Sequence, residues 1–273
     1  MNFMHRLRQI FSIRAVGIWP ASSATTAPTS SPLRGHIDAT HLLASDDLIR
    51  LGTQYGGWNI PRNLELGPES ICYLAGAGED ISFDCAVVER FGCRVRIVDP
   101  TPRAIQHFEA LQTAVRSGSK FAINSSESNF YELGVHGLQL MRFLPYGLAD
   151  ADVQQKFYFP RDPTHVSCSV VNLQKTEDYF TGQCYKLSTL MEMQQDFRVD
   201  LLKMNIEGAE YAAIDDLLQS KLSPATLLIV FDEGHTPMDG NAQERIRDCI
   251  GRLNTAGYRC VAIEGCNASF ILS

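Results

Sequence analysis

Residues 71–99 read ICYLAGAGEDISFDCAVVERFGCRVRIVD, and this stretch decides the fold class. Residues 71–75 form a short apolar run that predicts a buried strand, and residues 79–91 repeat apolar side chains at helical spacing. Gly92 stands just past that helix, where helices favour glycine. Residues 95–99 form a second apolar run. Strand, helix and strand in this order predict a parallel sheet covered by helices, so we expect an α/β fold.

The same alternation continues along the chain. We expect Thr101 to cap a helix that has Pro102 at its first position. Further apolar runs predict strands at residues 140–146, 199–204 and 227–231, and helical spacing predicts helices at residues 209–219 and 242–256.

The last two apolar runs, residues 258–263 and 268–272, have only residues 264–267 between them. A parallel crossover needs a dozen or more residues, so this pair is predicted to be an antiparallel hairpin. A mostly parallel seven-stranded sheet that ends in such a hairpin is typical of the class I methyltransferase fold, which is Rossmann-like. A dehydrogenase Rossmann domain keeps its last strand parallel.

Composition limits the classes of function. The chain has 273 residues, of which 45% are hydrophobic and 20% charged, as in ordinary globular proteins. Its net charge of −7, with no long basic run, argues against a nucleic-acid partner. None of the eight cysteines belongs to a C-x-x-C pair, so we expect no metal site and read them as reduced, buried side chains. Reduced cysteine favours a cytoplasmic location.

Residues 1–36 are expected to form an extension, and residues 37–273 the domain. The extension is rich in Ser, Thr, Ala, Pro and Arg, and residues 1–40 contain one acid, Asp38. Such a segment suits a disordered tail, or an organelle-targeting segment, which is also Arg-rich and poor in acids. Arg14 interrupts its apolar stretch, so a membrane span is not expected.

The loop after the first strand has the features of a nucleoside-binding turn. Gly76 and Gly78 let the backbone turn sharply and approach a ligand, and the following helix offers free N–H groups. Asp99 ends the next strand, where an acid can accept hydrogen bonds from ribose hydroxyls. A dinucleotide site requires a third glycine where this chain has Ile81, which disfavours close approach of a pyrophosphate.

A second group of polar residues follows two later strands. Asn205 and Glu207 come directly after the strand at 199–204, and His235 follows the strand at 227–231. Ligands of open α/β sheets bind beyond the carboxyl ends of the strands. We therefore expect these three side chains to hold the reacting group, with His235 as a candidate base.

At these residues the chain resembles the FkbM-type methyltransferase family. The matching stretches are YLAGAGEDISFD (73–84), VDPTP (98–102), PYGLAD (145–150), HVSCSVV (165–171) and DLLKMNIEGAE (200–210). The resemblance implies a methyltransferase that uses S-adenosylmethionine and usually methylates oxygen. The residues expected to bind this cofactor are Ala75, Gly76, Ala77, Gly78, Asp99 and Asp150, and those expected at the reaction centre are Asn205, Glu207 and His235.

The expected acceptor is a hydroxylated small molecule or a glycan. Residues 160–172 precede the strand at 199–204 as an insertion, and such loops usually carry specificity. His165, Ser167 and Ser169 in this insertion suggest a hydroxylated acceptor such as a sugar.

Three alternatives stay open. The family typically has Asp where this chain has Asn205, and an amide cannot act as a base, so a catalytically silent ligand-binding protein is one of them. A divalent cation held by Glu207, Asp232 and Glu233 is another, which Asn205 weakens as a poorer cation ligand. An NAD-dependent oxidoreductase is the third, disfavoured by Ile81 and by the terminal hairpin.

Overall fold

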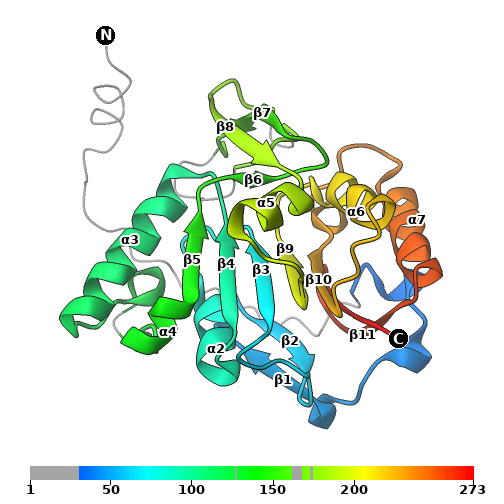
Figure 1. Cartoon of the computed structure of the whole chain (residues 1–273). Coiled ribbons are helices and arrows are strands. Elements are labelled where there is room, and N and C mark those ends of the chain that lie inside the picture. Colours follow the sequence, from blue (N-terminus) through cyan, green and yellow to red (C-terminus); the bar gives the residue numbers. More distant parts are fainter. Residues whose placement is uncertain (1–30, 127, 162–167, 173–174) are drawn as a thin grey trace.

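The computed structural model describes residues 31–126, 128–161, 168–172 and 175–273. A seven-stranded sheet forms its centre, in the order β11-β12-β10-β9-β3-β4-β5 (Figure 1). Its strands are β3 (Ile71–Ala75), β4 (Arg94–Val98), β5 (Met141–Leu144), β9 (Leu201–Met204), β10 (Thr226–Val230), β11 (Tyr258–Glu264) and β12 (Asn267–Leu272). Strand β12 is antiparallel to both β10 and β11, and the pairs among β10, β9, β3, β4 and β5 are parallel. The predicted hairpin and the mostly parallel α/β sheet are thus confirmed.

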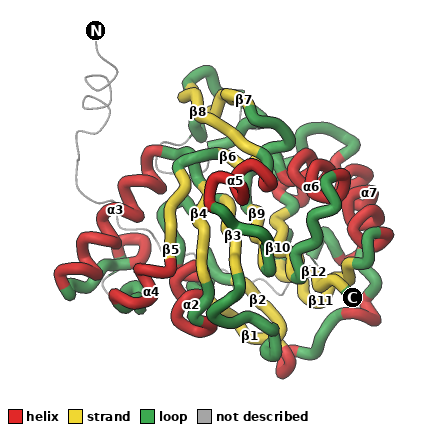
Figure 2. The backbone as a smooth tube through the Cα atoms, in the orientation of Figure 1, coloured by secondary structure: helices red, strands yellow, loops and turns green. Residues whose placement is uncertain are grey.

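Helices cover both faces of this sheet (Figure 2). They are α2 (Ser82–Phe91), α3 (Pro102–Ser117), α4 (Val135–Leu140), α5 (Leu187–Gln194), α6 (Glu210–Gln219) and α7 (Ala242–Thr255). Alternation along β3 separates two cores, because successive side chains of a strand point to opposite faces. Tyr73 packs with residues of α5, α6 and α7, whereas Cys72 and Leu74 pack with residues of α2 and α3. All eight cysteines are free, and all but Cys168 are buried.

The start of α2 and the cap of α3 differ from the expectation. Helix α2 begins at Ser82 rather than at residue 79, because residues 79–81 continue the glycine loop and Asp80 Oδ1 accepts a hydrogen bond from Ser82 N at 3.0 Å. Thr101 precedes α3 as predicted, but its side chain does not cap the helix. Its hydroxyl instead donates to Asp99 Oδ1 at 2.6 Å. Both differences serve the loop between β3 and α2.

An antiparallel hairpin precedes the central sheet, and the sequence patterns did not predict it. Strands β1 (Leu48–Leu51) and β2 (Trp58–Pro61) pair with each other and pack against α2 and the terminal hairpin. Arg50 Nη1 donates to Glu264 Oε2 at 2.5 Å, which ties this hairpin to β11. In the turn between β1 and β2, Thr53 N donates to Ser82 Oγ at 2.8 Å, so this turn lies beside the start of α2.

Short 3-10 helices complete the N-terminal part of the described chain and two loops. They are η1 (Arg34–His36), η2 (Ala39–His41), η3 (Ser45–Asp47), η4 (Ile123–Ser125) and η5 (Asp232–Gly234). Leu33 is fully buried in the core that contains α7. Residues 33–36 therefore pack against α7, and the expected boundary at residue 37 stays a prediction. Residues 1–30 lie outside the described part of the chain.

A second, three-stranded sheet lies beyond the carboxyl ends of the central strands (Figure 1). It consists of β6 (Gly147–Leu148), β7 (Val153–Tyr158) and β8 (Tyr179–Tyr185), in the order β6-β8-β7. Ala149, Phe157 and Cys184 form its small core. The expected insertion, residues 160–172, lies between β7 and β8, which pair with each other, and residues 162–167 of it lie outside the described part of the chain. Within the described residues, no helix is long and apolar enough to cross a membrane.

Candidate active site

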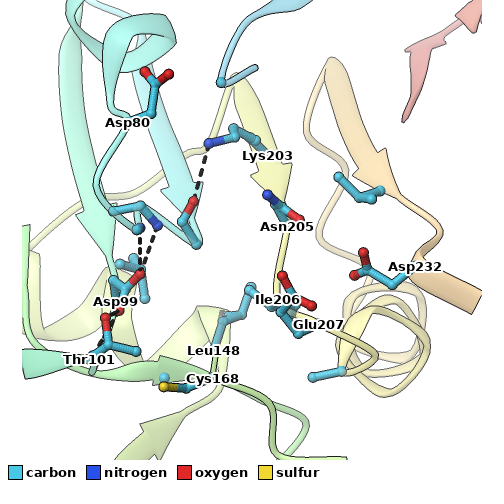
Figure 3. A pocket seen from close by; sticks show the side chains of 18 of the residues that line it. Asp80, Asp99, Thr101, Leu148, Cys168, Lys203, Asn205, Ile206, Glu207 and Asp232 are labelled. Atoms are coloured by element: carbon cyan, nitrogen blue, oxygen red, sulfur yellow. Dashed lines mark hydrogen bonds between the residues drawn. The ribbon is translucent and has the colours of Figure 1, made fainter. Parts of the chain in front are cut away.

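A cavity of about 350 Å³ opens at the carboxyl ends of β3, β4, β9 and β10 (Figure 3). This volume falls in the range of small-molecule sites. Its walls include the glycine loop, the end of β4, the end of β9, the start of η5 and the turn of the β1–β2 hairpin. The small sheet contributes Gly147, Leu148 and Phe157. The cavity therefore lies where ligands of open α/β sheets bind.

The glycine loop owes its first glycine to a backbone contact. Gly76 has a φ of 83°, and a Cβ atom there would lie 1.8 Å from Asn205 O. A side chain at this position would thus collide with the carbonyl that follows β9, and the positive φ adds strain for any other residue. Gly78 also has a positive φ, of 54°. Gly76 lets the two strand ends that border the cavity approach each other.

Asp99 fixes the glycine loop from the end of β4. Its Oδ2 accepts hydrogen bonds from Ala77 N at 2.8 Å and Gly78 N at 3.1 Å. Its Oδ1 accepts from Thr101 N at 2.7 Å and from the Thr101 hydroxyl. A carboxylate has about four lone-pair sites, so these four bonds use its capacity, and a ligand hydroxyl would have to share or displace one of them.

Lys203 extends from β9 beneath the glycine loop and meets a buried acid. Its ammonium donates to Gly76 O at 3.3 Å and lies 3.8 Å from Asp84 Oδ2 on α2. Burial raises the pKa of Asp84 to about 6, and the charge of Lys203 opposes that shift. A buried lysine in a strand needs a carboxylate partner, and Asp84 fills that position.

The segment after β9 is held in an uncommon conformation. Glu207 has a φ of 55°, in the left-handed region that side chains other than glycine rarely adopt, at a typical cost of about 1–3 kcal/mol. Glu210 stabilises this segment, since its Oε1 accepts from Ile206 N at 2.7 Å and its Oε2 from Gly208 N at 2.9 Å. The Ser169 hydroxyl bonds to Glu207 O from the other side. These contacts determine where the Glu207 side chain enters the cavity.

Carboxyl groups crowd the ends of β9 and β10. Burial first, then the charges of Glu210 and Glu207, raise the pKa of Asp232. Burial also raises the pKa of Glu210, which is almost completely inaccessible. Such a crowded group holds a proton that an isolated carboxylate would release. Within the described residues, Asp232 Oδ2 is buried without a hydrogen-bond partner.

Most of the predicted site residues meet in this cavity. The lining includes Gly76, Ala77, Gly78, Asp99, Asn205, Glu207 and His235. Ala75 is not among the lining residues, because strand alternation buries it in the core under α5 and α6. Asp150 is not among them either: it follows β6 and is exposed to solvent, whereas Gly147 and Leu148 of the same turn do reach the cavity.

The other sequence expectations have separate outcomes. Glu233, considered above as a cation ligand, is completely buried and paired with Arg245. His165 and Ser167 lie outside the described residues. Ser169 is nearly buried and bonds to backbone carbonyls, which gives it a structural position.

Several cavity residues were not predicted from the sequence. Tyr55, Gly56 and Trp58 reach it from the β1–β2 turn, and Cys168 reaches it from the insertion. Asp80 also lines it and bonds to the Thr53 hydroxyl at 2.6 Å. The signal in the sequence is Tyr55-Gly56-Gly57-Trp58, a glycine pair between two aromatic residues ahead of the first predicted strand.

Comparison with known families agrees with this geometry. The model of the methyltransferase FkbM domain matches residues 75–260, which include both the glycine loop and the end of β9. No curated protein matches the chain. Because the family model covers more than half of the sequence, the chain belongs to the FkbM methyltransferase family.

Proposed function

We propose that the protein transfers a methyl group from S-adenosylmethionine to an oxygen atom of a hydroxylated small molecule or glycan. Family membership supports methyl transfer. The strand order, with an antiparallel strand inserted between β10 and β11, is the arrangement expected of the class I methyltransferase fold. It also argues against a dehydrogenase domain, whose last strand is parallel.

The charge of the cavity supports this donor most strongly. Five acidic residues line it, Glu79, Asp80, Asp99, Glu207 and Asp232, and Lys203 is the one lysine or arginine among the described lining residues. Glu79 is paired with Arg103, and the pKa of Asp232 is raised, so the carboxylates that attract a cation here are those of Asp80, Asp99 and Glu207. S-adenosylmethionine carries a cationic sulfonium and an ammonium group, which such walls attract. The pyrophosphate of a dinucleotide would meet the same carboxylates unfavourably.

The cavity residues fit distinct tasks toward this donor. The N–H groups of the glycine loop and Asp99 are suited to the nucleoside, given the exchange of one Asp99 bond described above. Asn205 and Glu207 border the space in which an acceptor would be aligned, and alignment can supply much of the rate of a displacement. The donor supplies an electrophilic methyl group, and His235 is the exposed candidate that would take the acceptor proton.

The proposed role of His235 has a direct test. We expect His235→Ala to lower kcat and to remove the corresponding step from the pH profile, because the base is lost while the donor site is untouched. Thr236→Ala, next to it but outside the cavity lining, is the control. An unchanged profile in His235→Ala would remove this residue from the mechanism.

A catalytically silent binding protein of the same fold is the second candidate, and Asn205 favours it. This amide stands at the end of β9 inside the cavity, where the resemblance leads us to expect Asp. The variant Asn205→Asp separates the two functions. Our proposal expects similar or lower turnover in the variant, whereas a large gain would indicate a decayed catalytic site.

Methyl transfer itself is tested with donor labelled in its methyl group. We expect label to appear on hydroxylated acceptors from a panel of sugars, glycans and small alcohols, and the new bond to resist mild base as an ether does. Label on nitrogen, carbon or a carboxyl group would overturn the choice of oxygen. Labelled product with boiled protein or with Gly76→Val would show that the transfer does not depend on this site.

A further inference from the structure

Lys203 differs from every other charged residue of the cavity. It is 3% exposed, and it is the one basic residue that the structure places among the five acids of the described lining, His235 aside. A buried charge is costly unless it is paired and hydrogen-bonded. The contacts of this ammonium therefore show whether it is satisfied by the protein.

The protein satisfies Lys203 only in part. An ammonium has three N–H donors, and within the described residues one of them finds an acceptor, Gly76 O, at the long distance of 3.3 Å. Asp84 stands 3.8 Å away, which is an ion pair without a hydrogen bond. Asp84 is itself completely buried, and neither of its oxygens has a hydrogen-bond partner in the described structure. The ion pair thus holds the Lys203 ammonium in place, and two of its three N–H donors have no acceptor among the described residues.

The Lys203 ammonium lies where the cavity meets the glycine loop. Asn205 directly follows β9, two residues after Lys203, and both residues line the cavity. Figure 3 shows both beside the loop, with the dashed bond from Lys203 to the backbone. An ammonium and an amide N–H₂ together make a site for an anion. Elsewhere the described walls offer carboxylates, which would repel one.

We propose that Lys203, positioned by Asp84, binds the carboxylate at the amino-acid end of the methyl donor, with Asn205 beside it. The assignment rests on the proposed function, because S-adenosylmethionine is the donor that brings an α-carboxylate into this cavity. In this arrangement the acidic walls receive the cationic groups of the donor, and Lys203 receives its one anionic group. The site thereby selects the amino-acid end as well as the nucleoside end.

The test is a titration in which the carboxylate and the lysine are removed separately and together. Binding of S-adenosylmethionine and of decarboxylated S-adenosylmethionine is measured by calorimetry on the wild-type chain and on Lys203→Met. We expect the wild type to bind the decarboxylated compound about 10- to 100-fold more weakly, as for a lost charge-assisted hydrogen bond. We expect Lys203→Met to lose a similar factor for S-adenosylmethionine and to bind both compounds alike.

Two further variants separate binding from folding. Lys186→Met removes another lysine that pairs with a largely buried acid, Asp216, away from the cavity, and it should bind both compounds as the wild type does. Lys203→Met combined with Asp84→Asn avoids an uncompensated buried carboxylate if the single variant unfolds. Equal affinity of the wild type for the two compounds would overturn the inference and assign Lys203 to a structural ion pair. No binding of either compound by the wild type would instead overturn the proposed donor.

Discussion

At the scale of single residues, the close approach of Gly76 to Asn205 O brings together two segments that line the cavity. We predict that Gly76→Ala lowers the free energy of unfolding by about 2–4 kcal/mol, because the new Cβ meets Asn205 O and the φ of 83° is strained. Urea unfolding measures this loss.

Gly118→Ala is the matched control for that prediction. Gly118 has a similar φ of 70°, but a Cβ there would meet nothing within 4 Å. This variant should lose only the conformational part, about 1 kcal/mol. Equal losses in the two variants would show that the close approach to Asn205 is not required.

The carboxyl group of Asp232 predicts a dependence of stability on pH. Its pKa is raised in the folded chain by burial and by Glu210 and Glu207, so the folded state binds a proton more tightly than the unfolded state does. Stability from this group is present at low pH and is lost as pH rises above its ordinary pKa of 3.8 toward the raised one. We predict that the wild type loses at least about 1 kcal/mol more than Asp232→Asn between pH 5 and pH 8.

Urea unfolding at the two pH values measures this difference. Asp248→Asn, which alters an exposed carboxyl on α7, should follow the wild type. A parallel loss in wild type and Asp232→Asn would mean that the carboxyl cluster does not hold an extra proton in the folded chain.

Residues at strand ends were predictable, and their partners were not. Asp99, Asn205 and Glu207 follow apolar runs, and that placement alone predicts a position at the ligand edge of the sheet. Asp84 looks in the sequence like any polar residue of an amphipathic helix, and only the crossing of α2 over β9 brings it to Lys203. Asp150 was expected to bind the cofactor but is exposed to solvent, because the turn to which it belongs faces the cavity only through Gly147 and Leu148.

At the scale of elements, the β1–β2 hairpin is part of the folded core and also of the cavity wall. Trp58 is 3% exposed and packs on Phe83 of α2, with ring centroids 6.5 Å apart, whereas Tyr55 in the same turn is 74% exposed. We predict that Trp58→Ala lowers the free energy of unfolding by about 3–5 kcal/mol and that Tyr55→Ala changes it by less than about 0.5 kcal/mol. Equal, small effects in thermal and urea unfolding would contradict a structural role for the hairpin.

The segment between β7 and β8 contacts the segment that follows β9 through the Ser169 hydroxyl. Ser169 bonds to the carbonyl of Glu207, the residue with the left-handed backbone. We predict that Ser169→Ala increases amide hydrogen exchange in residues 205–210, because a contact that holds this segment is lost. Thr176→Ala, which removes a hydroxyl bonded to Phe159 O, should leave exchange there unchanged.

Burial on both faces explains which elements the sequence predicted. Strands β3, β9 and β10 are completely buried and mainly apolar, with Lys203 as the one charged residue in them, and they were found. Strand β6 has two residues, and β7 mixes exposed polar residues with the buried Phe157, so neither has a run to detect. Strands β1 and β2 have four residues each, and their pairing depends on packing against α2 and β11.

At the scale of the whole molecule, the order of the strands determines where the cavity forms. The parallel order β10-β9-β3-β4 places the carboxyl ends of these strands side by side, so that the glycine loop, Glu207 and Asp232 meet in one cavity. In the sequence, the four residues between the last two apolar runs predicted the antiparallel hairpin of this sheet. The acidity of the cavity was not predictable, because Asp80 and Asp232 belong to segments that only the fold brings together.

The most direct test of the account is a calorimetric titration of the full chain with S-adenosylmethionine and, separately, with NAD. We predict saturable binding of S-adenosylmethionine at one site per chain, weakened by added salt because the acidic walls attract a cation, and no binding of NAD. Binding of NAD in place of S-adenosylmethionine, or binding of neither by folded protein, would contradict the assignment of this cavity to a methyl donor.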